Sequence, residues 1–343
     1  MKDLKYLMAY SVPLSVFFSI YFRGVFSYTS LIYVFLFIPI IELFLPTNLS
    51  VFSEQETKSR LRDRFFDWLL YLNVPIVYII LFYGLHSFSN YDIKSYEYLG
   101  FVMSLGILLA TNAVNVAHEL GHRKNPFDIF ASRVLLLPCL YMHFTMEHNY
   151  GHHKNVATEL DPATAKEGQT LYHFWVTSVF GQYKNAWQIQ IKLLKNKKAS
   201  FLSLENKLLL FSVYQIIYLA TIYSFFGERA LVLAFLVGII SFLFLETINY
   251  IEHYGLKRKK VGNKYERVQK KHSWNSDHIM GRIILYELTR HSDHHFRASK
   301  KYQILESFKD SPRLPFGYPM SMLLAFVPPL WFAFIHPVLI KIE

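Results

Sequence analysis

The sequence predicts an all-α integral membrane protein with six transmembrane helices in hairpins and a cytoplasmic cap that is helical and rich in histidine. Apolar residues gather in runs of about 17 to 22 residues, the length that crosses a bilayer. Lysine and arginine are almost absent from the loops on one side of these runs. Nine of the 15 histidines fall in four short blocks, and all four lie on the other side.

The apolar runs predict spans at about residues 6–22, 29–46, 68–88, 97–117, 208–226 and 229–250. Short polar breaks at residues 23–24 and 227–229 join the first pair and the last pair into hairpins. No small-residue cleavage site follows the first run, so we expect a retained span rather than a signal peptide. Residues 1–343 are expected to form one membrane-embedded domain, with residues 118–207 and 251–343 in the cap.

Two other apolar stretches are not expected to cross the membrane. Val134 to Phe144 is too short and contains Pro138, which predicts a buried or re-entrant helix. Pro319 to Ile340 is long enough, but its four prolines favour interfacial helices or helices packed on the cap.

The distribution of basic residues predicts the orientation. If the N-terminus is cytoplasmic, only Arg23, Lys94 and Arg229 of the 36 basic residues lie on the far side. The same orientation places both termini and every histidine block in the cytoplasm. The single cysteine, Cys139, excludes an intramolecular disulfide and a cysteine-based metal site. No nucleic-acid recognition pattern accompanies the net charge of +11, so we expect no nucleic-acid partner.

The histidine blocks predict a metal centre, because imidazole binds iron, copper, zinc and nickel. A spacing of four puts His148 and His152 on one face of a helix, where both can reach one ion while His153 turns towards a second. Nine histidines are too many for one ion and suit two, whereas His86, His173 and His336 are expected to be ordinary packing residues. The blocks HELGH, EHNYGHHKN, NYIEHYG and HSDHH contain His118, His122, His148, His152, His153, His253, His291, His294 and His295.

Polar residues beside these blocks are expected to orient the imidazoles and to offset the charge of the ions. His272 and His278 are expected to do no more than this. The candidate orienting residues are Glu119, Glu147, Asp161, Glu246, Asn249, Glu252 and Asp293.

Two other readings of the same residues are possible. HELGH also fits the HExxH pattern of zinc proteases, in which two histidines bind zinc and the glutamate acts as a base. That reading leaves most of the other histidines without a role. A metal-storing or metal-transporting membrane protein is a second alternative.

Taken together, HELGH, EHNYGHHKNVAT followed by DPA, NYIEHYGL and RHSDHH resemble the motifs of the alkane 1-monooxygenase family. This family is a branch of the membrane di-iron proteins that includes xylene monooxygenase and, more distantly, fatty acid desaturases and sterol hydroxylases. The similarity runs from the third predicted span to about Gln303, and NYIEHYG separates this branch from the desaturases. Arg123 stands where many members have lysine and Tyr150 where many have arginine, but neither departure removes a histidine.

The resemblance implies that the nine histidines hold two non-haem iron ions in a bacterial inner-membrane enzyme. It implies hydroxylation of the terminal C–H bond of a medium-chain alkane with dioxygen and with electrons from rubredoxin and its reductase. A methyl-aromatic or fatty acyl substrate, and desaturation instead of hydroxylation, stay open. An apolar substrate would enter from the bilayer, and Phe35, Phe37 and Leu45 either line its path or only pack against lipid.

Electrons must come from another protein, because the chain carries no flavin fingerprint, haem motif or cysteine cluster. The segment from Lys257 to His272 holds eight lysines and arginines and one glutamate. It is expected either to attract an acidic donor or to bind anionic lipid headgroups. The candidate docking residues are Lys257, Arg258, Lys259, Lys260, Lys270 and Lys271.

Overall fold

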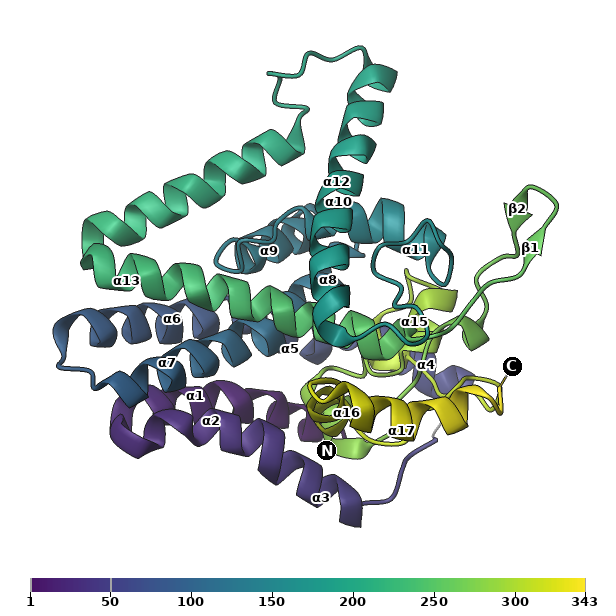
Figure 1. The fold of residues 1–343 in the computed structure, drawn as a ribbon, viewed down its shortest axis with the longest axis horizontal. Coiled ribbons are helices and arrows are strands. Elements are labelled where there is room, and N and C mark those ends of the chain that lie inside the picture. The colour runs from purple at the N-terminus through teal and green to yellow at the C-terminus, as the bar shows by residue number, and fades with distance from the viewer. Residues whose placement is uncertain (1, 50, 343) are drawn as a thin grey trace.

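The computed structural model describes residues 2–49 and 51–342, and its regular structure is almost entirely helical (Figure 1). Within these residues five helices are long and apolar enough to cross a membrane: Asp3–Phe22, Gly24–Phe44, Phe65–Asn90, Ser95–Gly121 and Lys207–His253. Four of them match predicted spans. The predicted spans 208–226 and 229–250 both fall within the fifth helix.

The first four long helices are built from shorter elements. Two of them contain a π-helical turn, Tyr33–Phe37 in the second and Leu109–Val114 in the fourth. In chain order the remaining elements are the 3₁₀ helix Lys2–Tyr10, α1 (Ser11–Phe22), the 3₁₀ helix Gly24–Tyr28, α2 (Thr29–Ile32), α3 (Ile38–Phe44), α5 (Phe65–Tyr71), α6 (Asn73–Asn90), α7 (Ser95–Leu108) and α8 (Asn115–Gly121).

The fifth long helix, α13 (Lys207–His253), is bent back on itself at Gly227 into two arms (Figure 1). Gly227 has φ 81° and ψ −176°, a conformation that essentially only glycine adopts. The second arm packs closely on α7, because a Cβ at Gly106 would lie 2.4 Å from Ile240 Cγ2. The second arm therefore brings its last residue, His253, to the end of the helical layer where α8 also ends.

The turns at the opposite end, on the left of Figure 1, are joined by contacts of basic side chains. The Arg23 guanidinium lies 4.1 Å from the centroid of the Tyr91 ring, and that of Arg229 lies 5.3 Å from the Phe88 ring. Outward-facing side chains along the long helices are apolar, for example Phe22, Ile79 and Phe225. Exposed apolar faces of this extent are what a bilayer covers.

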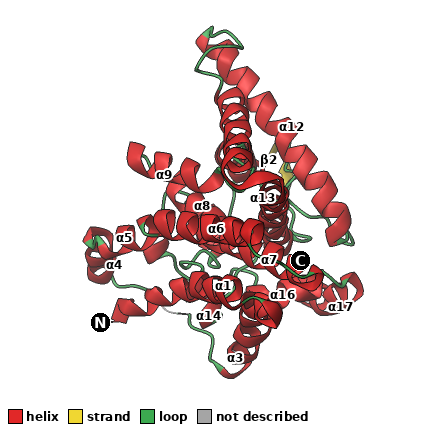
Figure 2. Cartoon of the chain, turned by 90° about the vertical axis from the view of Figure 1, so that its left-hand side faces the viewer, coloured by secondary structure: helices red, strands yellow, loops and turns green. Residues whose placement is uncertain are grey.

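The cap contains shorter helices and one small hairpin. α12 and the first arm of α13 approach each other at an angle and meet at the turn at residues 198–206, away from the other helices (Figures 1 and 2). The cap elements are α4 (Glu54–Arg62), α9 (Pro126–Leu136), α10 (Phe144–Glu147), the π-helical turn His148–His152, α11 (His153–Asn155), α12 (Leu171–Lys197), β1 (Lys260–Val261), β2 (Lys264–Tyr265), the 3₁₀ helices Lys270–His272 and Tyr302–Ile304, α14 (Ile279–Ile284), α15 (His291–Phe296), α16 (Tyr318–Ala325) and α17 (Pro328–Leu339).

Of the two apolar stretches that were not expected to cross the membrane, one does not form the expected helix and the other forms two. Val134 to Phe144 is buried over most of its length, but it is not a helix, because α9 ends at Leu136 and the chain turns before α10. Pro138 contributes no N–H to continue the helix, and Leu140 has a positive φ of 54°. Pro319 to Ile340 forms two short helices, α16 and α17, rather than a span, as expected.

The all-helical prediction missed the antiparallel pair β1–β2. Lys260 pairs with Tyr265, and Val261 pairs with Lys264. Gly262 has a positive φ of 60°, which suits a two-residue hairpin turn. The hairpin carries part of the basic segment away from the body of the cap (Figure 1).

A buried ionic cluster fixes the chain just before α15. Arg282 Nε donates to Glu287 Oε2 at 2.7 Å, and the Tyr6 hydroxyl donates to Glu287 Oε1 at 2.6 Å. Burial disfavours the charged carboxylate, but Arg282 and Arg290 hold the pKa of Glu287 below its usual range. The cluster stabilises the positive φ angles of Tyr286 and Glu287, and this turn directs α15 back towards the other histidines.

Candidate metal centre

The structure brings all nine candidate histidines together from four separate parts of the chain. They form two groups, and within each group the facing atoms lie within 4.8 Å of one another. The first group is His118, His122, His148, His153 and His294, and the second is His152, His253, His291 and His295.

The spacing of the ring nitrogens fits ligands of a common ion. His153 Nε2 lies 3.0 Å from His148 Nε2, 3.2 Å from His122 Nε2 and 3.2 Å from His294 Nε2. One nitrogen carries at most one hydrogen, so these three contacts cannot all be hydrogen bonds. Two ligands that are each about 2.0–2.1 Å from an ion lie about 3.0–3.4 Å apart. The first group therefore fits a single ion that accepts imidazole.

The second group shows the same spacing. His152 Nε2 lies 3.2 Å from His295 Nε2, and His291 Nε2 lies 3.1 Å from His253 Nε2. The donor set as a whole accordingly fits two ions, one for each group.

The expected pairing within the EHNYGHHKN block is wrong. His148 shares its group with His153, and His152 belongs to the other group. The reason is the π-helical turn His148–His152, in which hydrogen bonds join residues five apart rather than four. The wider turn aligns residues 148 and 153 on one side. His118 and His122, on an ordinary α-helical turn, do share a group as their spacing of four predicts.

Burial keeps most of these imidazoles neutral. Desolvation, followed by the neighbouring imidazoles, holds the pKa of His148, His153 and His294 well below its usual range. Burial lowers the pKa of His122 to about 3. Neutral rings keep a free lone pair, which is the form that binds a metal.

Asp161 is one of two candidate orienting carboxylates that contact a ring. Its Oδ2 lies 2.9 Å from His152 Nδ1 and also accepts a hydrogen bond from the Thr164 hydroxyl at 2.6 Å. Burial alone would lower the pKa of His152, but the Asp161 carboxylate raises it above the usual value. A hydrogen bond at Nδ1 leaves Nε2 of His152 directed at its group.

Glu252 is the other carboxylate that contacts a ring, and it approaches from a different side. Its Oε2 lies 3.2 Å from His291 Nε2, the same nitrogen that faces His253. Its Oε1 accepts a hydrogen bond from the Tyr318 hydroxyl at 2.6 Å. The Glu252 carboxylate therefore lies beside the same ring nitrogens that face one another in the second group.

The other candidate orienting residues bind other partners in the described part of the chain. Glu119 pairs with Arg123, and Asp293 pairs with Lys300. Glu147 accepts a hydrogen bond from Asn185, and Asn249 donates to Glu246. Glu246 also accepts from Tyr141, Ser178 and Gln182, which tie α12 to the second arm of α13. Among the described residues, none of these five makes a hydrogen bond or ion pair with an imidazole ring of the two groups.

The remaining histidines lie outside both groups. His272 lies 3.3 Å from Glu266, and His278 lies 3.1 Å from the Ser276 hydroxyl. Tyr318 and Thr164, which bind the two carboxylates, did not emerge from the sequence. Thr164 follows the DPA motif closely, but Tyr318 is remote from every block and offered no signal.

Two small neighbouring cavities, of about 40 and 50 Å³, together mark a narrow and mainly apolar path, the apolar cavity, between the long helices and the histidines. Its inner part is lined by His118, His148 and His291, and its outer part by Phe35 and other apolar side chains. Both parts share the same four lining residues where they meet: Ala110, Ile248, Leu285 and Tyr318. The π-helical turns of the second and fourth long helices contribute to its walls.

The other two residues proposed for this path do not line it. Phe37 and Leu45 are exposed on the outer surface, with 52% and 37% of their areas accessible. Phe35 instead packs against Phe244, with ring centroids 5.7 Å apart. This aromatic pair narrows the outer part of the cavity.

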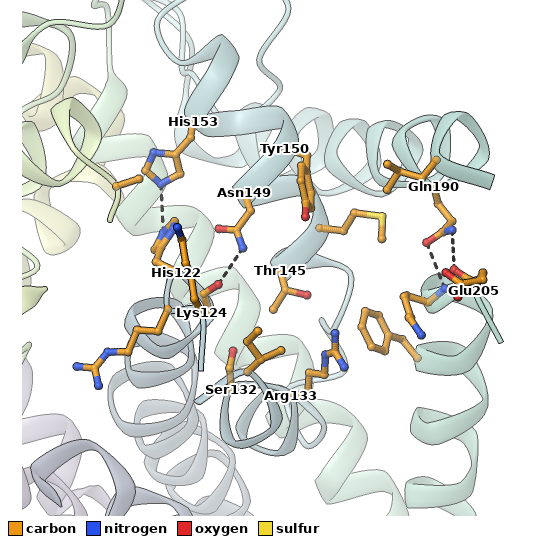
Figure 3. A pocket seen from close by; sticks show the side chains of 18 of the residues that line it. His122, Lys124, Ser132, Arg133, Thr145, Asn149, Tyr150, His153, Gln190 and Glu205 are labelled. Carbon is orange, nitrogen blue, oxygen red and sulfur yellow. Dashed lines mark hydrogen bonds between the residues drawn. The ribbon is translucent and has the colours of Figure 1, made fainter. Parts of the chain in front are cut away.

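A separate cavity of about 630 Å³ reaches the first group from the polar side (Figure 3). His122 and His153 lie on its wall, with Asn149 and Arg133 nearby. The Asn149 side-chain amide donates to the Gly121 carbonyl at 3.0 Å and so helps to hold the end of α8. The histidines therefore lie between an apolar cavity and a polar, basic one.

Comparison with known proteins relates the chain to membrane oxygenases. The model of the family described as fatty acid desaturase matches residues 94–335. Alkane 1-monooxygenase 1 of Alcanivorax borkumensis is 38% identical over 296 residues, which cover 86% of this chain and 73% of that protein. Alkane 1-monooxygenase of Pseudomonas putida is 37% identical over 272 residues, covering 79% and 67%. The xylene/toluene monooxygenase hydroxylase component of Pseudomonas putida is 29% identical over 292 residues, covering 84% and 78%.

The Asp161 contact predicts a selective effect on metal binding. Asp161→Asn should weaken metal binding by about 10- to 100-fold, because the amide cannot hold the His152 ring as the carboxylate does. Metal retained by the purified protein against a competing chelator measures this. Glu159→Gln, an exposed change two residues away, is the control. Equal metal affinity in the two variants would contradict the role given to Asp161.

Proposed function

Because the chain belongs to the alkane 1-monooxygenase branch of the fatty acid desaturase family, we propose that it hydroxylates the terminal carbon of medium-chain alkanes at a non-haem di-iron centre. The observation that carries the proposal is the position of the two histidine groups at the closed end of an apolar cavity. A metal centre at the end of an apolar path suits oxidation of an apolar molecule. We propose the nine histidines of the two groups as the iron ligands.

Two iron ions held there would supply the activation of dioxygen, with two electrons and two protons, so that one oxygen atom enters a C–H bond and the other leaves as water. The residues of the chain hold and aim the reactants. The apolar cavity excludes water and directs an alkane end between His118, His148 and His291. The Asp161 carboxylate fixes the tautomer of His152, and Tyr318 fixes the Glu252 carboxylate.

We propose six membrane crossings, with the two arms of α13 as the last pair, and a single domain whose cap lies in the cytoplasm of a bacterium. The contacts that join the turns of Arg23 and Arg229 to α6 support this arrangement, because they gather these turns at the end opposite the histidines. Only three basic residues would then lie outside the inner membrane, as the bias in basic residues favours.

For the electron donor we propose rubredoxin, itself reduced by a reductase, with the basic segment of the cap as its docking surface. Lys260 and Lys264 lie on the projecting hairpin β1–β2. Arg258 has a different role, since its guanidinium donates to the carbonyls of Lys154 and Glu266 and so fixes the base of the hairpin. Of the six candidate docking residues, those on or near the hairpin are best placed for long-range attraction.

Two alternative functions, desaturation and proteolysis, can be distinguished from alkane hydroxylation. The family match also accommodates desaturation of an acyl chain, in which case the product is an alkene and no oxygen is inserted. The zinc protease hypothesis is disfavoured, because a protease of this kind would need Glu119 as its base, and Glu119 is buried and paired with Arg123. Analysis of the product from an alkane, as alcohol or alkene, separates the first alternative from the proposal.

Removal of one proposed ligand should separate metal binding from folding. His148→Ala should abolish alkane hydroxylation and lower the iron content of the purified protein, while insertion into the membrane is unchanged. His336→Ala should affect neither, because His336 bonds only the Tyr254 hydroxyl in the described chain and lies outside both groups. Iron analysis by mass spectrometry and gas chromatography of the alcohol provide the two measurements. Full iron content with normal turnover in His148→Ala would overturn the ligand assignment.

The Phe35–Phe244 pair predicts the preference for alkane length. Phe35→Ala should raise kcat/KM for longer alkanes relative to shorter ones by about tenfold or more, because each methylene accommodated in an apolar pocket contributes about 1–3 kcal/mol. Competition between alkanes of different length measures the ratio. Phe37→Ala, which removes an exposed ring two residues away, should leave the ratio unchanged. An equal shift in both variants would show that the cavity is not the substrate path.

Charge reversal on the hairpin tests donor docking. Lys260→Glu with Lys264→Glu should raise the KM for rubredoxin by about tenfold at low salt and leave kcat with saturating donor unchanged, since steering acts on association. Lys184→Glu, on the exposed surface of α12, is the matched control. An unchanged KM and an unchanged salt dependence would place the docking surface elsewhere.

A further inference from the structure

The outer face of α12 carries an unbroken row of apolar side chains. Tyr172, Val176, Phe180 and Tyr183 are all exposed, and Phe180 has 72% of its area accessible. Their spacing of four, four and three places them on one side of the helix. The opposite side is buried against the protein and includes polar residues such as Ser178 and Gln182. A helix with one packed face and one exposed apolar face needs a further apolar neighbour.

The position of α12 indicates what that neighbour is. The helix runs across the direction of the long apolar helices rather than along it (Figure 1). The turn that follows it exposes Leu202 and Leu204, with 81% and 76% of their areas accessible. Next in the chain is Lys207, where the long apolar helix α13 begins. α12 and its turn therefore lie at the level where the membrane-crossing helices start, as an interfacial helix does.

The basic cavity lies between this helix, α9 and the first arm of α13 (Figure 3). Its charged lining consists of five cations and one carboxylate: Arg123, Lys124, Arg133, Lys197, Lys207 and Glu205. Glu205 is engaged by Lys197 at 2.7 Å. The cavity thus carries an excess of positive charge that nothing in its own lining balances.

Three cations of the cavity, Lys124, Arg133 and Lys207, form no salt bridge within the part of the chain that the structure describes, although Glu205 lies near enough to attract Lys207. Arg133 points into the cavity, where its guanidinium lies 5.6 Å from the centroid of the Phe211 ring (Figure 3). Lys207 Nζ donates only to the Leu204 carbonyl, at 2.9 Å. Both residues lie close to apolar side chains of helices that face the membrane. This combination of free positive charge and adjoining apolar surface matches a phosphate attached to acyl chains.

We propose that α12 lies in the headgroup layer of the membrane and that the basic cavity beneath it binds the phosphate of an anionic phospholipid. Arg133 and Lys207 hold the phosphate, and the acyl chains extend along α9 and the first arm of α13. Because His122 and His153 lie on the wall of the cavity, a bound headgroup covers the polar side of the first histidine group. The headgroup site does not depend on the identity of the substrate or the metal.

Lipid titration tests the headgroup site. The holoprotein in detergent is titrated with short-chain phosphatidylglycerol, with phosphatidylcholine and with inorganic phosphate, and bound lipid is counted by native mass spectrometry. Arg133→Gln with Lys207→Gln should weaken phosphatidylglycerol binding by about 30-fold, since each cation near a lipid phosphate contributes about 1 kcal/mol. Arg133→Lys should retain most of the affinity. Lys195→Gln, a nearby charge on α12 outside the cavity lining, should leave it unchanged.

Three results would overturn this site. Equal retention of phosphatidylglycerol by the double variant and by Lys195→Gln would mean that the cavity is not the lipid site. Binding of inorganic phosphate as tight as that of phosphatidylglycerol would mean a site for free anions. Loss of affinity for rubredoxin in the double variant, with lipid binding intact, would assign the cavity to the donor protein.

Fluorescence quenching tests the position of α12 independently. A fluorophore on the Phe180→Cys variant, in vesicles that contain brominated lipid, should be quenched strongly, and one on the Lys192→Cys variant, at an exposed position on the other side of the helix, weakly. The native Cys139 is buried and does not compete for labelling. Equal, weak quenching at both positions would show that the helix stands clear of the bilayer and would remove the basis of the proposal.

Discussion

The close approach of the imidazole ring nitrogens is the constraint on which the rest of this structure depends. His153 Nε2 lies 3.0–3.2 Å from three other ring nitrogens, and lone pairs directed at one another across such distances repel unless a cation lies between them. The fold has to hold this arrangement from four distant segments. The buried Arg282–Glu287 cluster before α15 and the amide of Asn149 at the end of α8 are examples of the contacts that do so.

The apolar helices contribute rigidity as well as the proposed route for the substrate. His118 lies near the end of one long helix, and His253 is the last residue of another, so both imidazoles move only if a whole helix moves. Glu246 shows how a buried carboxylate is stabilised inside such a helix. Its hydrogen bonds from Tyr141, Ser178 and Gln182 satisfy it and connect the second arm of α13 to α12 and to the turn before α10. Helix position, and through it ligand position, depends on this polar contact.

The features that the sequence predicted well are those that depend on residues close together in the chain. Long apolar runs predicted the long helices, and the four histidine blocks contained every ring that converges. The division of the rings was beyond local pattern, because the π-helical turn at His148–His152 changes which neighbours align. Tyr318 and the partners of Glu246 on α12 were also beyond it, since those contacts join residues more than 60 positions apart. The bend of α13 could be predicted in part, because the polar break at Gly227 interrupts an otherwise apolar run.

The two cavities explain why the histidines lie at the boundary between the long helices and the cap. An apolar molecule cannot share one path with protons that arrive through water, because water would then have to line an apolar cavity. Electrons from a donor protein also arrive from the aqueous side. Here His118 and His148 line the apolar cavity, whereas His122 and His153 line the basic one, although all four belong to the same group. The imidazole rings themselves thus form the partition between the two. A reaction that joins an apolar C–H bond to reactants from water needs a partition of this kind, with ligands in contact on both sides.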